Sequence, residues 1–212
     1  MLLYDQFVNE DVHLAVWKMD ETEDELWNCF HEQRAVYEQE IKNISNKHRR
    51  LEYLTVRLLL SQMIHQEPII TYSEEGKPSL QNCPLHISIS HTNSYVTVIT
   101  SQMCVVGIDI EMKKEKIYRV RHKFLSSLEQ IDMGNELDSL LLHWCAKETV
   151  FKMSSIPLPE FSEDIIVKPF EVKNEGSFDA YETKTNVDYH LFYHVSSDYV
   201  MTYSFRVDNN IR

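Results

Sequence analysis

The chain has 212 residues and a formal net charge of −12 at pH 7, and 43% of its residues are hydrophobic. It is long enough to bury a substantial core, in one domain or in two small lobes. The negative charge argues against general nucleic-acid binding, and no apolar stretch approaches the roughly 18 residues of a membrane helix. We therefore expect a cytoplasmic protein whose four cysteines stay reduced.

The first half of the chain is predicted to contain helices and then strands. The spacing of apolar residues predicts helices over residues 23–37 and 50–64. Short alternating or apolar runs predict four strands, the last two forming a hairpin, over residues 69–71, 85–90, 95–100 and 104–111.

The second half repeats this order. Three helices are predicted, over residues 118–124, 127–133 and 136–153. Antiparallel strands are predicted over residues 165–168, 178–183, 187–194 and 199–207. The fold class is therefore α+β, and we expect two similar lobes, residues 1–101 and 102–212.

Two carboxylates lie on one predicted strand. Side chains alternate between the faces of a strand, so Asp109 and Glu111 point the same way, about 6.6 Å apart along the chain. Val106, Ile108 and Ile110 occupy the other face and are expected in the core. The strand thus has an apolar face and an acidic face.

A third carboxylate lies on the helix predicted over residues 136–153. At about 100° per residue, Glu148 falls in the middle of an apolar stripe. The apolar members are Leu137, Leu141, Trp144 and Phe151. A carboxylate there costs several kcal/mol unless it is compensated. Lys152 lies on the same side and Lys147 points away, so the alternative is a weak surface pair of Glu148 and Lys152.

Together the three acids indicate a divalent-metal site. Carboxylates without histidine or thiolate partners suit hard ions, so the sequence favours Mg²⁺ or Mn²⁺ over Zn²⁺. Mg²⁺ keeps coordination positions for water and substrate phosphate, which points to phosphate chemistry.

Phosphates would have to be held by side chains, because the four glycines form no phosphate-binding loop. Candidates are His91 at a strand end, Lys77 in a turn, and the basic run 47–50 at a helix start. The alternatives are a structural histidine, a solvated turn lysine and a solvated helix face. A basic run opposes the positive end of the helix dipole, which weakly favours an anionic ligand there.

At this point the motifs carry a resemblance. Gly76-Lys77-Pro78, Ser90-His91, Gly107-Ile108-Asp109-Ile110-Glu111 and the helix segment 144–152 follow one another in this order. The chain resembles the 4′-phosphopantetheinyl transferases, in particular the long, monomeric class that activates surfactin synthetase. The resemblance spans residues 47–152.

The resemblance implies both a fold and a reaction. The lobes would be related by a pseudo-twofold axis, each an antiparallel sheet packed with helices, with the active site at the lobe interface. The enzyme would transfer the 4′-phosphopantetheine moiety of coenzyme A to a serine hydroxyl of an apo acyl or peptidyl carrier protein. Adenosine 3′,5′-bisphosphate would be released.

The resemblance also implies roles for the acids and for one lysine. Asp109, Glu111 and Glu148 would hold Mg²⁺, with Mn²⁺ as the other option, against the coenzyme A pyrophosphate. Glu148, or a water that it orients, would remove the serine proton. Lys152 would neutralise charge on the pyrophosphate and on the leaving group.

Further residues would bind the nucleotide. His91, with Ser90 beside it, would contact the phosphates. Lys77 and Pro78 would border the adenosine. Either Arg49 or Arg50 would meet the 3′-phosphate.

A basic segment follows the acidic strand. It comprises Lys113, Lys114, Lys116, Arg119, Arg121 and Lys123. One interpretation is a solvated surface, and the other is a docking surface for an acidic carrier protein. Members of the family place carrier contacts over residues 117–128.

Two alternative functions stay open. An acidic strand followed by a later glutamate and lysine also suits a metal-dependent nuclease or phosphohydrolase. The second alternative is a non-enzymatic carrier-binding protein. We predict the transferase, acting as a monomer with coenzyme A and a carrier protein as partners and without nucleic acid or membrane.

Overall fold

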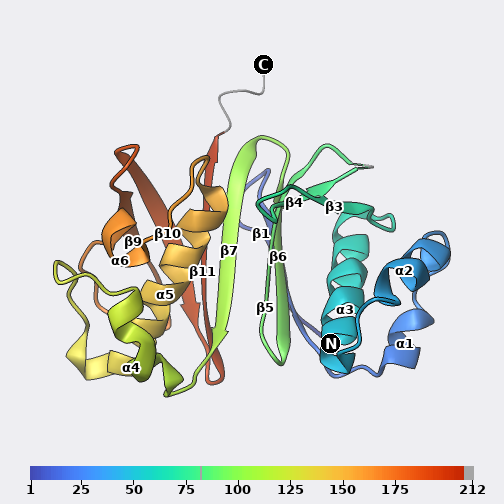
Figure 1. Cartoon of the computed structure of the whole chain (residues 1–212), viewed down its shortest axis with the longest axis horizontal. Helices are drawn as coiled ribbons and strands as arrows, with labels where there is room; N and C mark the ends of the chain where they lie inside the picture. The colour runs from blue at the N-terminus through green and yellow to red at the C-terminus, as the bar shows by residue number, and fades with distance from the viewer. Residues whose placement is uncertain (82, 208–212) are drawn as a thin grey trace. The chain divides into compact units, whose positions relative to one another are not determined.

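The structure is a computed structural model and describes residues 1–81 and 83–207. This part of the chain is mixed α+β with antiparallel sheets, as predicted, and divides into two compact units, residues 1–104 and 105–207 (Figure 1). The lobe boundary expected after residue 101 and the pseudo-twofold arrangement with a site at the lobe interface stay predictions. The end of the second predicted lobe, residues 208–212, lies outside the described residues. No helix within residues 1–81 and 83–207 is long and apolar enough to span a bilayer.

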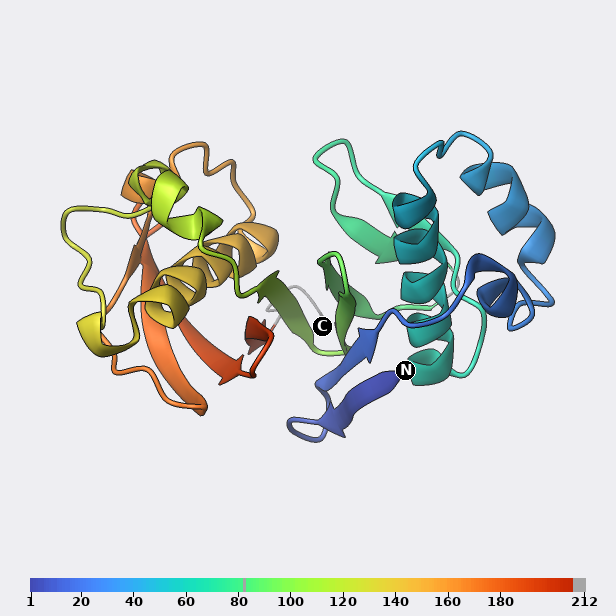
Figure 2. The same ribbon diagram turned by 90° about the horizontal axis from the view of Figure 1, so that it is seen from below.

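The first unit is built on a four-stranded antiparallel sheet. Its strands, in spatial order, are β1 (Leu2–Phe7), β2 (His13–Lys18), β6 (Tyr95–Ser101) and β5 (His86–His91). The helix α3 (Lys47–Ile64) packs on this sheet. The helices α1 (Glu23–Trp27) and α2 (Arg34–Ile41) lie on the side of α3 that faces away from the sheet (Figure 2). A separate two-stranded sheet pairs β3 (Ile70–Tyr72) with β4 (Pro78–Leu80).

Apolar side chains hold α3 to the sheet. Leu54 and Leu59 from the helix are fully buried in one cluster with Val96 and Val98 of β6. The helix begins after Asn46, whose side chain accepts the backbone N–H groups of His48 and Arg49. The apolar face of α3 and this N-cap place the basic start of the helix at a fixed position beside the sheet.

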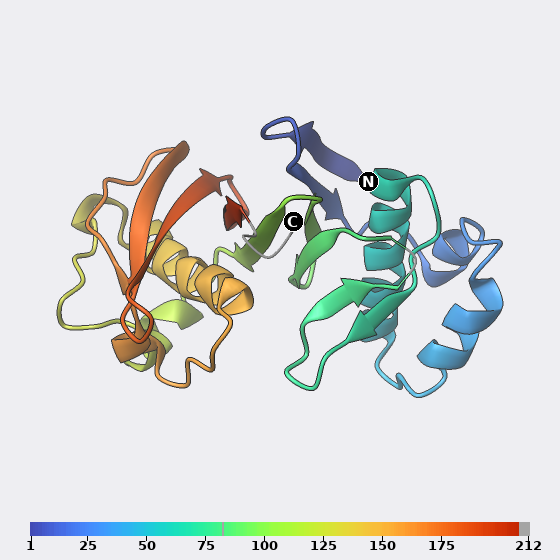
Figure 3. The ribbon, with the colours of Figure 1, turned by 90° about the horizontal axis from the view of Figure 1, so that it is seen from above.

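The second unit is a five-stranded sheet covered by one long helix. Its strands, in spatial order, are β7 (Cys104–Met112), β11 (Tyr199–Val207), β10 (Val187–Val195), β9 (Glu175–Glu182) and β8 (Ile165–Val167). The helix α5 (Glu136–Met153) lies across the sheet (Figure 3). Short helices flank it: α4 (Lys116–Val120), the 3-10 turns 121–123 and 133–135, and α6 (Phe161–Asp164).

The first predicted helix is wrong, because residues 23–37 contain all of α1 and the start of α2. The helical structure is interrupted between them, where the carboxylate of Glu67 accepts the backbone N–H groups of His31, Glu32 and Gln33 at 2.6, 3.2 and 2.6 Å. A carboxylate from far along the chain thus satisfies donors that would otherwise continue a helix.

The helix predicted over residues 127–133 is also wrong, since this segment is irregular up to the 3-10 turn that begins at Met133. The side chain of Glu129 is directed inward and accepts the N–H groups of Ser126 at 2.6 Å and Val167 at 2.8 Å. A long-range contact therefore determines the local conformation.

The predicted hairpin of the third and fourth strands is not formed. In the sheet orders of the described residues, β6 lies between β2 and β5, while β7 lies beside β11. The strands β1, β2 and β4 and the helix α6 were not predicted. By contrast, α5 and β11 have the predicted bounds.

Candidate functional site

The strand β7 presents its two acids on one face, as predicted. Val106, Ile108 and Ile110 on the other face are at most 4% exposed. Asp109 is itself only 5% exposed, whereas Glu111 at the end of the strand is partly exposed. A buried carboxylate needs a compensating partner, and helix α5 supplies it.

Gly107 determines how closely α5 approaches β7. A Cβ at this position would lie 2.6 Å from the backbone oxygen of Thr149 and 2.6 Å from Cγ of Met153. Only glycine leaves room for the helix backbone here. The close approach brings the turn of α5 that carries Glu148 and Lys152 beside the acidic end of β7.

Three hydrogen bonds join α5 to β7 beyond Gly107. The Lys152 ammonium donates to Asp109 Oδ1 at 2.8 Å and to the Ile108 carbonyl at 2.7 Å. The Trp144 indole N–H donates to Glu111 Oε1 at 3.0 Å. Beyond the strand, Lys113 pairs with Asp138 at 2.9 Å. Side chains two residues apart on β7 thus each meet a partner on α5.

The electrostatic environment raises the proton affinity of two of the acids. Burial raises the pKa of Glu148 from its ordinary 4.5 to about 7, and the charges of Asp109 and Glu111 add to this against the opposing ammonium of Lys152. Burial and the charge of Asp109 also raise the pKa of Glu111, which the Trp144 hydrogen bond counteracts. A carboxyl group that titrates near neutrality is suited to accept and release protons.

The alternative of a Glu148–Lys152 surface pair is not what the structure forms, because the Lys152 ammonium is held by Asp109. The predicted stripe lies only partly in the core. Leu141 is 3% exposed, and Leu137 and Trp144 pack against the core, whereas Phe151 is 38% exposed. The fully buried side of α5 includes Leu140, Leu142, Cys145 and Ala146. Glu148 therefore lies at the edge of the buried surface.

Lys147, which is expected to point away from the centre of the apolar stripe, is completely buried, and the sequence did not predict this burial. Its ammonium pairs with the equally buried carboxylate of Glu129 at 2.9 Å and donates to the carbonyls of Phe161 and Ile165 at 3.0 and 2.6 Å. Burial lowers the pKa of Lys147, and Glu129 opposes that change. The pair fastens α5 to the segment before it and to β8.

The donor chemistry of Asp109, Glu111 and Glu148 fits a hard divalent cation, because such ions prefer oxygen ligands and a cation would relieve the mutual repulsion of the three acids. Among the described residues, however, no group of three or more histidine, cysteine or acidic side chains has an arrangement that could hold a metal ion. One oxygen of Asp109 accepts a hydrogen bond from the ammonium of Lys152. The residue types thus suit a hard cation, whereas their arrangement in the structure does not form a metal site.

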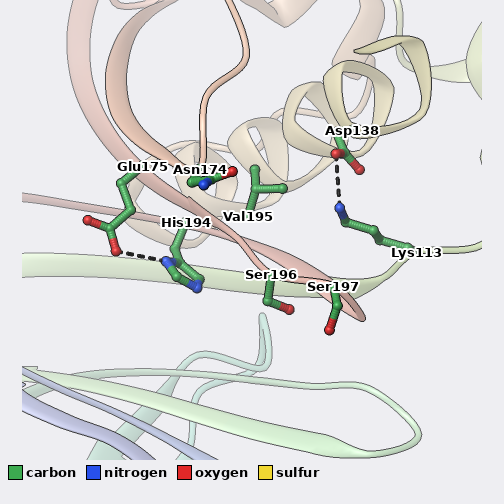
Figure 4. A pocket seen from close by; sticks show the side chains of 8 residues that line it. All are labelled: Lys113, Asp138, Asn174, Glu175, His194, Val195, Ser196 and Ser197. Atoms are coloured by element: carbon green, nitrogen blue, oxygen red, sulfur yellow. Dashed lines mark hydrogen bonds and ion pairs between the residues drawn. The ribbon is translucent and has the colours of Figure 1, made fainter.

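A pocket of about 770 Å³ lies at the Lys113 end of this series, bounded by the Lys113–Asp138 pair on one side and the His194–Glu175 pair on the other (Figure 4). In it, Lys113 and His194 each already face an acid, at 2.9 and 3.1 Å. Of the predicted basic segment, Arg121 also pairs with an acid of α5, Glu136, at 3.1 Å.

The nucleotide-binding candidates lie in the first unit, and several of them line one pocket of about 420 Å³. Arg49, His91 and Pro78 line it, together with Gly76, whose φ of 80° forms the tight turn between β3 and β4. Lys77 is exposed in that turn and does not line the pocket, and Ser90 is buried in β5.

The two arginines separate clearly. Arg49 faces the pocket, whereas Arg50 donates to Glu23 at 3.0 Å and to the Ile44 carbonyl at 3.4 Å. The same pocket contains residues that the sequence analysis did not identify, namely Glu52, Tyr53, Arg57 and Tyr72. Only Glu52 carried a local signal, because it follows Arg49 by three residues on a helix, where side chains are neighbours.

Comparison with known proteins agrees with the resemblance. Residues 105–204, from the start of β7 into β11, match the model of the 4′-phosphopantetheinyl transferase superfamily. This range contains Asp109, Glu111, Glu148 and Lys152.

Two relatives are named 4′-phosphopantetheinyl transferase AcpT. The one from Salmonella typhimurium is 35% identical over 65 residues, which is 30% of this chain and 34% of the relative. The one from Escherichia coli K12 is 27% identical over 115 residues, 49% of this chain and 57% of the relative. The chain thus spans between about a third and somewhat over half of these relatives. Together the matches support a 4′-phosphopantetheinyl transferase, with the superfamily match lying in the second unit.

Proposed function

We propose that the chain transfers the 4′-phosphopantetheine moiety of coenzyme A to a serine hydroxyl of an apo acyl or peptidyl carrier protein, releasing adenosine 3′,5′-bisphosphate. One observation carries the proposal: Glu148, with a pKa of about 7, lies among Asp109, Glu111 and Lys152 on elements inside the superfamily match. We further propose that it is a cytoplasmic monomer of the long, surfactin-synthetase-activating class.

In this proposal Glu148 accepts the proton of the attacking serine. Serine is a poor nucleophile at neutral pH, so a base must take its proton as the attack on phosphorus proceeds. The bond from phosphorus to the bisphosphate breaks, and the negative charge remains on the leaving group. Lys152, whose side chain is 22% exposed, is available to neutralise that charge.

Asp109, Glu111 and Glu148 would hold Mg²⁺ or Mn²⁺. When bound, such a cation neutralises charge on the pyrophosphate and stabilises the leaving group. Trp144 keeps Glu111 in place through its indole N–H. The raised pKa of Glu111 and Glu148 supports this assignment, because a cation would favour the ionised forms of both acids.

The pocket of the first unit would bind the nucleotide portion. Arg49 supplies cationic N–H donors and His91 a ring nitrogen, and Pro78 and Tyr72 supply apolar surface for the adenosine. Ser90 and Lys77 would border these groups. We assign the 3′-phosphate to Arg49 and not to Arg50, because Glu23 holds Arg50.

Intact-mass spectrometry of apo carrier domains incubated with the protein, coenzyme A and Mg²⁺ tests the proposal. We expect a mass gain of one phosphopantetheine arm that disappears with chelator or with Asp109→Ala. Coenzyme A binding without any transfer to several acyl and peptidyl carriers would indicate an enzyme with a narrow partner or one that has lost its activity. Neither binding nor transfer would favour the metal-dependent hydrolase.

A further inference from the structure

A buried acid lies in the pocket of the first unit, where a phosphate-binding site would be expected to contain only cations. Glu52 on α3 is 6% exposed and lines the pocket with Arg49 and His91. A carboxylate there repels an anionic ligand, and its burial is costly unless cations surround it.

Three side chains converge on this carboxylate. Arg49 Nη1 lies 2.9 Å from Oε2, while His48 Nε2 and His91 Nδ1 lie 3.2 and 3.3 Å from Oε1. Arg49 and His48 reach it from the preceding turn of the same helix, and His91 reaches it from the end of β5. Glu52 therefore joins the helix side of the pocket to its sheet side.

The same carboxylate holds a guanidinium and an imidazole close together. Arg49 Nη1 and His91 Nε2 are 3.5 Å apart, the longest distance at which a hydrogen bond forms. Both side chains also contact Glu52, Arg49 through Nη1 and His91 through Nδ1. Arg49 has five N–H donors and its contact with Glu52 uses Nη1, so the guanidinium retains donors for a ligand.

We infer that Glu52 is a positioning residue for nucleotide binding: it holds Arg49 and His91 together as a preformed site for a phosphate group of the ligand. The inference rests on the proposed function for the identity of the nucleotide. Free of ligand, the carboxylate compensates the charge of Arg49 and contacts His91. With ligand, it keeps both donors converged at little reorganisation cost.

The same helix offers a matched control. Arg50, the next residue, pairs with Glu23 at 3.0 Å, a distance close to that of Arg49 and Glu52, but neither Glu23 nor Arg50 lines the pocket. Glu23→Gln therefore removes a comparable ion pair of α3 without touching the site.

The experiment measures kcat and KM for coenzyme A in Glu52→Gln, Glu52→Asp and Glu23→Gln, and the affinity of each for adenosine 3′,5′-bisphosphate by calorimetry. For Glu52→Gln we expect about a tenfold loss of affinity and a matching rise in KM, the effect of one charge-assisted contact, with kcat within about twofold. Glu52→Asp, which keeps the charge, should recover part of the affinity. Glu23→Gln should bind like the wild type.

Unchanged or tighter binding by Glu52→Gln would overturn the inference, as would equal losses in Glu52→Gln and Glu23→Gln or no recovery in Glu52→Asp. If Glu52→Gln does not fold, Glu52→Asp alone must bind more weakly than the wild type at unchanged kcat, and wild-type affinity would refute the role. The calorimetry needs no turnover. A wild-type protein that binds the bisphosphate but transfers nothing would therefore refute the proposed function and leave this inference standing.

Discussion

Lys152 on α5 holds Asp109 on β7 through a contact of 2.8 Å, and the same ammonium also binds the carbonyl of Ile108 at 2.7 Å. The side chain of Asp109 is 7% exposed, so this ammonium is the compensating charge that the acid requires. If Asp109 also binds Mg²⁺, as we propose, removing Lys152 should change both the stability of the protein and its response to Mg²⁺.

Lys152→Ala should lower the free energy of unfolding by about 2 to 4 kcal/mol, because Asp109 keeps its charge in a buried position. Transfer activity should fall strongly. Since the lysine no longer competes for Asp109, Mg²⁺ should raise the melting temperature of the variant more than that of the wild type. Denaturant titrations measure the loss of stability, and thermal unfolding with and without Mg²⁺ measures the response to the metal. An equal response of the two proteins to Mg²⁺ would argue against Asp109 as a metal ligand.

Glu148→Gln should abolish transfer and stabilise the protein at alkaline pH. The folded-state pKa of Glu148 is raised from 4.5 to about 7, so between these values the folded protein binds more protons than the unfolded chain, and stability falls as pH rises. With chelator present, the variant should exceed the wild type by about 1 to 3 kcal/mol at pH 8. The difference should shrink towards pH 5. A difference that is independent of pH would contradict the titration of Glu148.

Gly107→Ala should separate α5 from β7. The new methyl group would meet the backbone oxygen of Thr149 at 2.6 Å, and a helix backbone cannot rotate away as a side chain can. We expect a loss of about 1 to 3 kcal/mol, with a larger relative loss of transfer rate. Gly134→Ala is the control, because its methyl group would meet only a side-chain oxygen of Asp132 at 3.2 Å. Equal effects of the two changes would contradict this account.

Lys147→Met should be among the most destabilising changes in the second unit. It leaves the carboxylate of Glu129 buried beside an apolar side chain, a loss of about 3 to 5 kcal/mol. Adding Glu129→Gln removes the stranded charge, so the double variant should be more stable than Lys147→Met alone. Thermal unfolding of the two single variants and the double variant measures the coupling. Additive losses would show that the two side chains act independently.

Arg49→Ala and Arg50→Ala should have different effects. The first removes a donor from the pocket and should raise KM for coenzyme A about tenfold. The second breaks the contact with Glu23 outside the pocket and should reduce stability by no more than about 1 kcal/mol, with KM unchanged. Steady-state kinetics with a carrier in excess distinguishes them. A larger KM effect for Arg50→Ala would reverse our assignment.

The sequence was most informative where a pattern is local. The bounds of α5 and the shared face of Asp109 and Glu111 follow from helical and strand periodicity. The predicted helices failed where an acid binds backbone far away in the chain: Glu67 accepts the N–H of His31, and Glu129, within residues 127–133, accepts the N–H of Val167. No periodicity within the segments themselves contains that information.

The candidate site shows the same division. Asp109, Glu111 and Lys152 were identifiable from residue type and spacing, and the structure gathers them. The burial of Lys147 was not identifiable, and Glu52 had only its helical spacing from Arg49 as a signal, because each has a further partner on another element. His91 reaches Glu52 from β5, and Glu129 reaches Lys147 from the segment before α5.

The two lysines on either side of Glu148 have different roles within one short motif. Lys152 is partly exposed and faces the acids, whereas Lys147 is completely enclosed. Both lysines of Trp144-Cys145-Ala146-Lys147-Glu148-Thr149-Val150-Phe151-Lys152 nevertheless compensate a buried carboxylate, Lys147 that of Glu129 and Lys152 that of Asp109. A descendant of this chain that had lost Glu148 would still need both lysines for its stability. The two lysines of the motif could therefore survive in a protein that had lost the proposed reaction.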